Sequence, residues 1–266
     1  MTVSLAAEVR GDPAHPTVVF LHGFMGATDD WRPVMEALAD AYYCVALDLP
    51  GHGQTPASDD EAAYSFAGAL AAVALRVDEL GVKQAHWVGY SMGGRLALAG
   101  AFQYPERLQS LVLLSSSPGL LEPRQAAARV RHDETWAKRL LQPPLEDALT
   151  AWYGQPLFAS LHDYPSAYNA MIARRLRNRP PELARSMLGM SVGRQTPLWE
   201  KLSALIVPTL VLAGEKDPKY CEIAARMAAA SDRIQARHVP AAGHSAHIEQ
   251  PAEVGALLRN WIDTHK

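Results

Sequence analysis

A serine between glycines is the residue of this sequence best suited to chemistry. Gly89, Tyr90, Ser91, Met92 and Gly93 follow a short apolar run and precede a helix-forming stretch. The pattern G-x-S-x-G in that context is typical of a nucleophile at a sharp turn from strand to helix. Glycines let the two elements approach without side-chain collision, and the turn exposes the hydroxyl. The sequence therefore predicts that Ser91 takes part directly in a reaction.

A histidine and an aspartate further along the chain are suited to activate this serine. A serine hydroxyl reacts poorly at neutral pH unless an imidazole, held in one tautomer by a carboxylate, takes its proton. His244 follows the last expected strand, and Asp217 follows the strand before it. The order Ser, Asp, His differs from the orders in chymotrypsin and subtilisin. His247 and Glu215 compete for the two roles, but we expect them to orient the loop or face solvent.

Negative charge that develops on a substrate oxygen must be met by donors already in place. Residues 22–26, which contain two glycines, follow the first central strand and form a suitable loop. We expect the backbone N–H groups of Phe24 and Met92 to form this oxyanion hole.

A metal site is a weaker interpretation of the histidines. His22, His52, His244 and His247 lack the H-E-x-x-H or Cys/His spacing of common metal sites. We therefore expect neither a metal nor another cofactor. Asp48 also ends an expected strand, and we interpret it as a structural residue that stabilises the loop beside the site.

The elements that position these residues alternate between short apolar runs and longer helical patterns, which predicts a mostly parallel sheet with helices on both faces. From about Pro118 to Trp199 the sequence shows no strand pattern, and prolines separate segments with a helical pattern. We therefore predict a core domain of residues 1–117 and 200–266 with an inserted helical cap of residues 118–199. The expected strands are residues 17–21, 43–47, 85–88, 108–114, 209–213 and 234–239, and the expected core helices are residues 31–39, 65–80 and 94–103.

Composition narrows the class of protein. The 266 residues are 48% hydrophobic and 20% charged, with a formal net charge of -3, which favours a folded soluble chain over one drawn to nucleic acid or an anionic membrane. No apolar run reaches the roughly 20 residues needed to span a bilayer, and no export signal is visible. The two cysteines, Cys44 and Cys221, form no disulfide framework, which fits a cytoplasmic location. The oligomeric state stays open.

These motifs give the chain a resemblance to the α/β-hydrolase superfamily along nearly its whole length. Within it, the sequence resembles the 2-succinyl-6-hydroxy-2,4-cyclohexadiene-1-carboxylate synthases of menaquinone biosynthesis, mainly through its cap. The strings that carry the resemblance are residues 22–26 with Trp31, 48–53, 89–95, 117–120, 129–136, 152–158 and 243–251.

The resemblance implies a carbon-oxygen lyase that eliminates pyruvate from 2-succinyl-5-enolpyruvyl-6-hydroxy-3-cyclohexene-1-carboxylate, with the triad abstracting a proton. It implies that Arg95, Arg129 and Arg177 bind substrate carboxylates, while Tyr90 and Trp152 line the pocket.

Independently of the resemblance, the cap is rich in arginine, the side chain that binds carboxylates in bidentate geometry. A polycarboxylate substrate would need several such groups, although most surface arginines pair with neighbouring acids. Arg95 is distinctive because it lies one helical turn after Ser91. Trp136 and Phe158 are expected in the cap core. The cap arginines include Arg124, Arg129, Arg131, Arg139, Arg174, Arg175, Arg177, Arg179 and Arg185.

Two alternatives remain. A serine hydrolase of small esters or of a carbon-carbon bond would use the same triad with Ser91 as a covalent nucleophile. A receptor that binds without turnover is disfavoured because all three triad positions are occupied.

Overall fold

The computed structural model describes residues 3–265, and its centre is a seven-stranded sheet in the order β1-β3-β2-β4-β5-β6-β7. Every expected strand is present, and all neighbouring pairs are parallel except β1 with β3. The antiparallel edge strand β1 is an addition that sequence patterning missed, because it has only four residues and is partly exposed. The strands are β1 (Ala7–Arg10), β2 (Thr17–Leu21), β3 (Tyr43–Leu47), β4 (Ala85–Tyr90), β5 (Leu108–Leu114), β6 (Thr209–Gly214) and β7 (Ile234–Val239).

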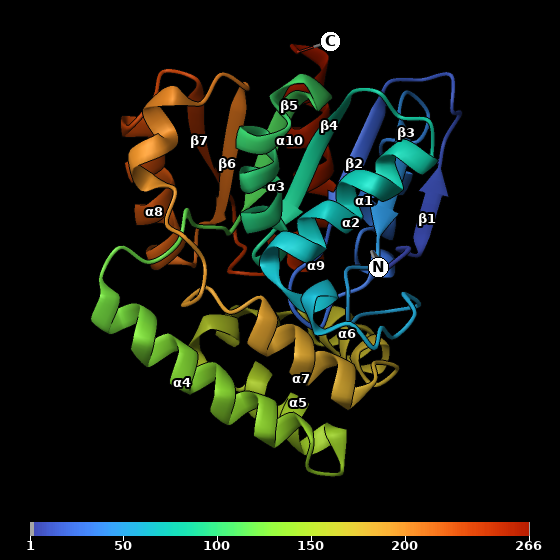
Figure 1. Ribbon diagram of the computed structural model, residues 1–266. Coiled ribbons are helices and arrows are strands. Elements are labelled where there is room, and N and C mark those ends of the chain that lie inside the picture. Colours follow the sequence, from blue (N-terminus) through green and yellow to red (C-terminus); the bar gives the residue numbers. More distant parts are fainter. Residues whose placement is uncertain (1–2, 266) are drawn as a thin grey trace.

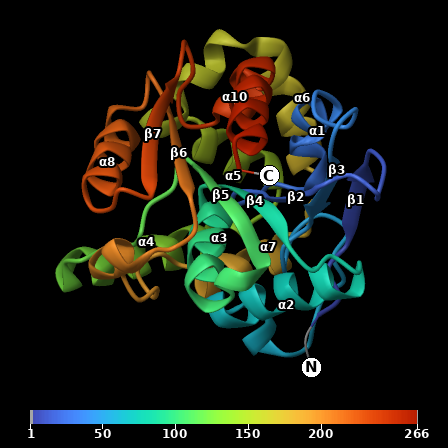
Figure 2. The ribbon, with the colours of Figure 1, turned by 90° about the horizontal axis from the view of Figure 1, so that it is seen from above.

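Helices cover both faces of the sheet, as Figure 2 shows from above. The central strands are apolar on both sides, so each face forms its own buried cluster. Helices α2, α3 and α8 pack on one face, and α1 and α10 pack on the other. The core helices are α1 (Arg32–Glu36), α2 (Phe66–Glu79), α3 (Met92–Gln103), α8 (Pro218–Ala229), α9 (Ala246–Glu249) and α10 (Pro251–Asp263).

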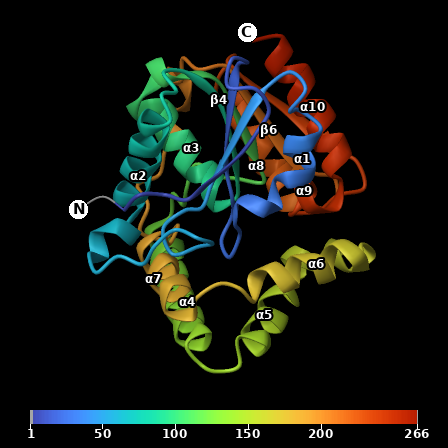
Figure 3. The same cartoon turned by 90° about the vertical axis from the view of Figure 1, so that its right-hand side faces the viewer.

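Between β5 and β6 the described chain forms helices and no strand. Figures 1 and 3 show these helices gathered beyond the carboxyl ends of the parallel strands. Proline stands at the start of several of them, where its fixed φ and missing N–H cost nothing. Their buried residues form a separate apolar cluster that Met25 and Ile248 of the core join. The cap helices are α4 (Pro123–Leu140), α5 (Leu145–Tyr153), α6 (Pro165–Arg175) and α7 (Pro180–Gly189).

None of the helices within residues 3–265 is long and apolar enough to cross a bilayer.

Candidate active site

Ser91 occupies the sharp turn between β4 and α3. Its backbone adopts φ 49° and ψ -106°, a conformation that costs energy in a non-glycine residue. The flanking glycines make the turn possible: a Cβ on Gly89 would lie 2.5 Å from the carbonyl oxygen of Gly93, and one on Gly93 would lie 2.3 Å from that of Leu21. The strained serine therefore stands at the carboxyl edge of the sheet, at the amino terminus of α3.

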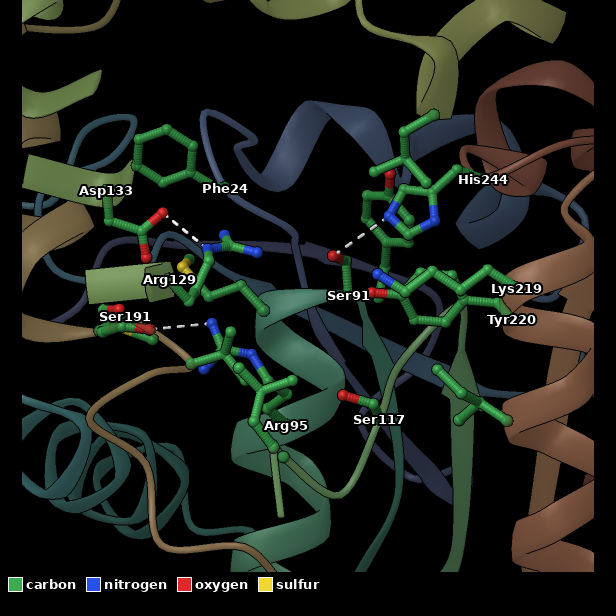
Figure 4. A pocket seen from close by; sticks show the side chains of 18 of the residues that line it. Phe24, Ser91, Arg95, Ser117, Arg129, Asp133, Ser191, Lys219, Tyr220 and His244 are labelled. Carbon is green, nitrogen blue, oxygen red and sulfur yellow. Dashed lines mark hydrogen bonds and ion pairs between the residues drawn. The ribbon is translucent and has the colours of Figure 1, made fainter. Parts of the chain in front are cut away.

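His244 connects Ser91 to Asp217. Its Nδ1 lies 2.9 Å from Asp217 Oδ2, and its Nε2 lies 3.3 Å from Ser91 Oγ. With the Nδ1 proton donated to the carboxylate, Nε2 is left to accept the serine proton. His244 is 2% exposed and Asp217 is 5% exposed, so water competes little for these bonds. Figure 4 shows the contact between His244 and Ser91 at the edge of the pocket.

The competing residues have other contacts. Glu215 accepts a hydrogen bond from the Ala241 amide and so holds the loop before His244. The ring of His247 is buried between Trp31 and Tyr90, with centroids 4.6 and 4.3 Å away. Burial lowers the pKa of His247 to about 3, against the opposing effect of nearby Asp30.

Asp48 has the structural contacts expected of it. Its two carboxylate oxygens accept hydrogen bonds from the amides of Thr28 and Gln54, both at 2.7 Å. Asp48 therefore joins the loop after β2 to the loop after β3.

The loop after β2 turns back beside the serine. The Gly26 amide donates to the Gly23 carbonyl at 2.9 Å, which closes a four-residue turn with Phe24 and Met25 at its centre. A Cβ on Gly23 would lie 3.5 Å from Ser91 Cβ, so the turn touches the serine. The turn bond uses neither central amide, and Met92 opens α3, where first-turn amides lack helical partners. The arrangement can place the Phe24 and Met92 amides toward an anion.

A cavity of about 520 Å³ opens over these groups. The residues expected there from the sequence that do line it are Phe24, Tyr90, Ser91, Met92, Arg95, Arg129, Trp152 and His244. Trp152 reaches the Phe24 ring edge to face, with centroids 5.4 Å apart. Phe158 belongs to the cap core as expected, and it also lines the cavity, with its ring 5.7 Å from that of His244. Trp136 is partly buried against the same cap cluster.

Two arginines place positive charge in the cavity. Arg95 donates to Gln195 Oε1 and to the Met190 carbonyl, both at 2.9 Å. Burial, and next the nearby charge of Arg129, lower the pKa of Arg95 to about 10. Arg129 pairs through Nε with Asp133 Oδ1 at 2.7 Å. In Figure 4 both arginines lie to one side of Ser91 while His244 lies to the other. Guanidinium groups in such positions are suited to bind an anionic group of a ligand.

The structure does not bring Arg177 to the cavity, which corrects the expectation taken from the resemblance. Arg177 pairs with Asp29, and its side chain is 58% exposed. Arg175 lines the cavity instead, and its Nη1 and Nη2 lie 2.8 and 2.6 Å from the oxygens of Asp30. Burial opposes its charge, but Asp30 outweighs burial and raises the pKa of Arg175. The sequence signal was spacing: Arg175 lies four residues after the buried Met171 on α6.

The residues that the structure describes contain no group of three or more His, Cys, Asp or Glu side chains placed to hold a metal ion.

Comparison with known proteins gives one consistent relationship. The family profile described as "alpha/beta hydrolase fold" matches residues 16–251. A putative 2-succinyl-6-hydroxy-2,4-cyclohexadiene-1-carboxylate synthase of Bacillus subtilis is 35% identical over 98% of this chain and 95% of its own length. The corresponding synthase of Escherichia coli O1:K1 is 38% identical over 95% of this chain and 96% of its own length.

Solved structures with different described activities share this fold. MenH from S. aureus superposes with a TM-score of 0.91 at 30% identity, covering 100% of this chain and 99% of its own. A thermophilic esterase from Thermogutta terrifontis, with malate bound, gives 0.85 at 27% identity, covering 98% of this chain and 94% of its own.

Proposed function

Because the chain belongs to the alpha/beta hydrolase fold family, and within it to the 2-succinyl-6-hydroxy-2,4-cyclohexadiene-1-carboxylate synthases, we propose that it is a lyase of menaquinone biosynthesis. It eliminates pyruvate from 2-succinyl-5-enolpyruvyl-6-hydroxy-3-cyclohexene-1-carboxylate and releases 2-succinyl-6-hydroxy-2,4-cyclohexadiene-1-carboxylate. One observation carries the proposal beyond family membership: Ser91 and His244, which are linked to each other and through His244 to Asp217, line a cavity that also contains Arg95, Arg129 and Arg175.

The reaction begins with removal of a proton. His244 accepts the hydroxyl proton of Ser91 while the serine oxygen takes the proton from the ring carbon beside the succinyl carbonyl. The carbonyl oxygen gains negative charge, and the amides of Phe24 and Met92 stabilise it. Asp217 keeps His244 in the tautomer with the proton on Nδ1, and it stabilises the imidazolium that forms.

The second stage breaks the carbon-oxygen bond to the enolpyruvyl group. Electrons of the extended enolate shift through the ring double bond, the diene forms, and the leaving oxygen keeps the bonding pair. The enolpyruvate gains a proton on carbon to become pyruvate, so the proton taken from the ring is balanced. The triad thus acts as base and proton carrier without forming an acyl enzyme.

The substrate carries three carboxylates, which the cavity's guanidinium groups suit. Arg95 and Arg129 lie on one side of Ser91, and Arg175 is held by two hydrogen bonds to the Asp30 carboxylate. Tyr90 and Trp152 complete the binding surface. Guanidinium groups stay charged when desolvated, so they keep their attraction for carboxylates inside the cavity. We assign residues 118–199 as the cap domain that closes this site, and we place the enzyme in the cytoplasm, consistent with two cysteines that are both free thiols.

A serine hydrolase is the second candidate, favoured by the likeness to the Thermogutta esterase. It would use Ser91 as a covalent nucleophile on a neutral ester. The test is to measure the specificity constants of the purified protein for the enolpyruvyl cyclohexene substrate and for a simple aryl ester. We expect the first to exceed the second by orders of magnitude, and the reverse preference would favour the hydrolase.

A further inference from the structure

The turn that carries Phe24 is held by the cap as well as by the core. The docking segment, residues 174–179 at the end of α6 and just beyond it, contacts the loops after β2 and β3. Its contacts are those of Arg174 and Arg175 with Asp30, Arg177 with Asp29, Asn178 with Met25 and Gly53, and Arg179 with Thr55. The cap therefore binds directly to the loop beside Ser91.

Asn178 joins both loops through one side chain. Its Nδ2 donates to the Met25 carbonyl at 2.9 Å, and its Oδ1 accepts from the Gly53 amide at 3.1 Å. A carbonyl on one side and an amide on the other fix which end of the side chain is oxygen and which is nitrogen. Asn178 is only 8% exposed, so the loss of either bond would strand a buried polar group.

Met25 needs such support because its backbone is strained. Its φ is 63°, the left-handed region that non-glycine residues avoid, and it is the third residue of the turn closed by Gly23 and Gly26. Strained residues of this kind persist only where their surroundings hold them. Asn178 binds the carbonyl of this residue, which directly follows Phe24.

The Phe24 ring is fixed from two further sides. It meets the ring of His52 at 5.6 Å and that of Trp152, on cap helix α5, at 5.4 Å. His52 immediately precedes Gly53, the second partner of Asn178. The position of the Phe24 amide therefore depends on the core loops and on the cap together.

We propose that Asn178 is a positioning residue for the oxyanion hole, which makes correct placement of the Phe24 amide depend on docking of the cap. This rests on the proposed function, in which that amide stabilises the enolate. When Asn178 is replaced, Met25 can relax from its left-handed conformation. The turn then moves the Phe24 amide away from the developing charge. Substrate binding through the arginines is left in place, so the loss falls on turnover.

The test compares Asn178→Asp and Asn178→Ala with Asn169→Asp and Asn169→Ala, the exposed asparagine of α6. The aspartate keeps the acceptor for Gly53 and the side-chain volume but cannot donate to Met25, so it remains informative if the alanine variant fails to fold. We expect kcat for pyruvate release to fall about 10- to 100-fold in both Asn178 variants, with KM changed less than about three-fold. Both Asn169 variants should match the wild type. Thermal unfolding is measured in parallel.

A fluorophosphonate provides a readout that does not depend on the natural substrate. Ser91 oxygen bonds to phosphorus, fluoride leaves, and the hydroxyl proton passes to His244, while the phosphoryl oxygen occupies the oxyanion hole. We expect the second-order rate of this modification, followed by intact mass, to fall about 10-fold or more in the Asn178 variants. Ser91→Ala, which lacks the reacting hydroxyl, measures the background rate of modification.

The outcomes distinguish the positioning role of Asn178 from the proposed lyase function. Wild-type rates of modification and unchanged kcat in the Asn178 variants would overturn the positioning role, as would an effect confined to KM. A wild-type enzyme that reacts with the fluorophosphonate but releases no pyruvate would overturn the proposed function alone, and slower modification in the variants would still support the role of Asn178.

Discussion

Glu249 brackets His244: its carboxylate oxygens accept hydrogen bonds from the amides of the residues on either side, Gly243 at 2.7 Å and Ser245 at 3.2 Å. Glu249 is 4% exposed, so these bonds are shielded from water and fix the loop that carries the base. Glu249 lies in residues 243–251, one of the strings that carry the family resemblance, but only the structure shows its role.

We predict that Glu249→Ala lowers kcat at least about 10-fold, because His244 loses its fixed distance to Ser91. Glu249→Gln keeps one acceptor and should retain intermediate activity. The measurements are kcat, KM and the pH dependence of kcat/KM, with Glu253→Gln, exposed on α10, as the matched control. Full activity of Glu249→Ala would show that the loop carrying His244 keeps its conformation without this carboxylate.

The triad should behave as one unit. Ser91→Ala, His244→Ala and Asp217→Asn should each lower turnover by several orders of magnitude, and a double substitution should cost little more than a single one. Asp217→Asn retains the shape but favours the wrong tautomer of His244. Single-turnover assays of pyruvate release measure the effect. A fully active Ser91→Ala enzyme would refute the assignment.

The cavity arginines should matter for charged substrates only. Arg95→Ala and Arg129→Ala should each cost about 2 to 5 kcal/mol in the specificity constant for the polycarboxylate, because a desolvated charge-assisted contact is lost. Cleavage of a neutral aryl ester should suffer far less. Lysine substitutions should restore only part of the activity, since they lack the planar fork. Arg237→Ala, exposed on β7, is the control. Equal losses on both substrates would mean that the arginines support structure.

The ion pairs of two arginines in the docking segment, Arg175 and Arg177, should differ in how much they stabilise the fold. Asp30→Ala leaves the buried Arg175 without its partner and should lower the free energy of unfolding by about 3 to 5 kcal/mol. Arg177→Ala should lower it by less than about 1 kcal/mol, because that side chain is 58% exposed. Urea unfolding of both variants measures the difference. A larger loss from Arg177→Ala would contradict the placement of these side chains.

Acid should weaken the fold through buried neutral histidines. The pKa of His247 is lowered from 6.5 to about 3 by burial, and burial also lowers the pKa values of His22 and His52. Below pH 6.5 the unfolded chain binds protons that the folded chain cannot, so stability is full above that pH and falls as pH decreases toward 3.

Replacing His247 should flatten this dependence. We expect the slope of the unfolding free energy between pH 6 and 4 to decrease by up to about 1.4 kcal/mol per pH unit in His247→Phe, which can keep the ring stack with Trp31 and Tyr90. The exposed His238→Phe is the matched control. Urea titrations at several pH values provide the slopes, and an unchanged slope in His247→Phe would show that this ring is protonated in the folded protein.

The sequence by itself determined those parts of the candidate site that depend on local sequence pattern. The glycines around Ser91 predict the strained turn, because steric demands act between immediate neighbours. Asp217 and His244 follow apolar runs, and parallel strands bring their carboxyl ends to one edge, so their meeting was predictable without coordinates. The sheet and the helical insertion followed from the same periodicity.

Only the tertiary structure decided which long side chains face the cavity. Arg175 is the last residue of α6 and Arg177 lies in the turn that follows, so the exact end of the helix decides which of the two faces the cavity, and sequence patterns locate helix ends poorly. The bonds of Asn178 to Met25 and Gly53 join residues that are more than a hundred positions apart in the chain. Local patterns do not predict such contacts, because the contacts depend on how the cap packs against the core loops.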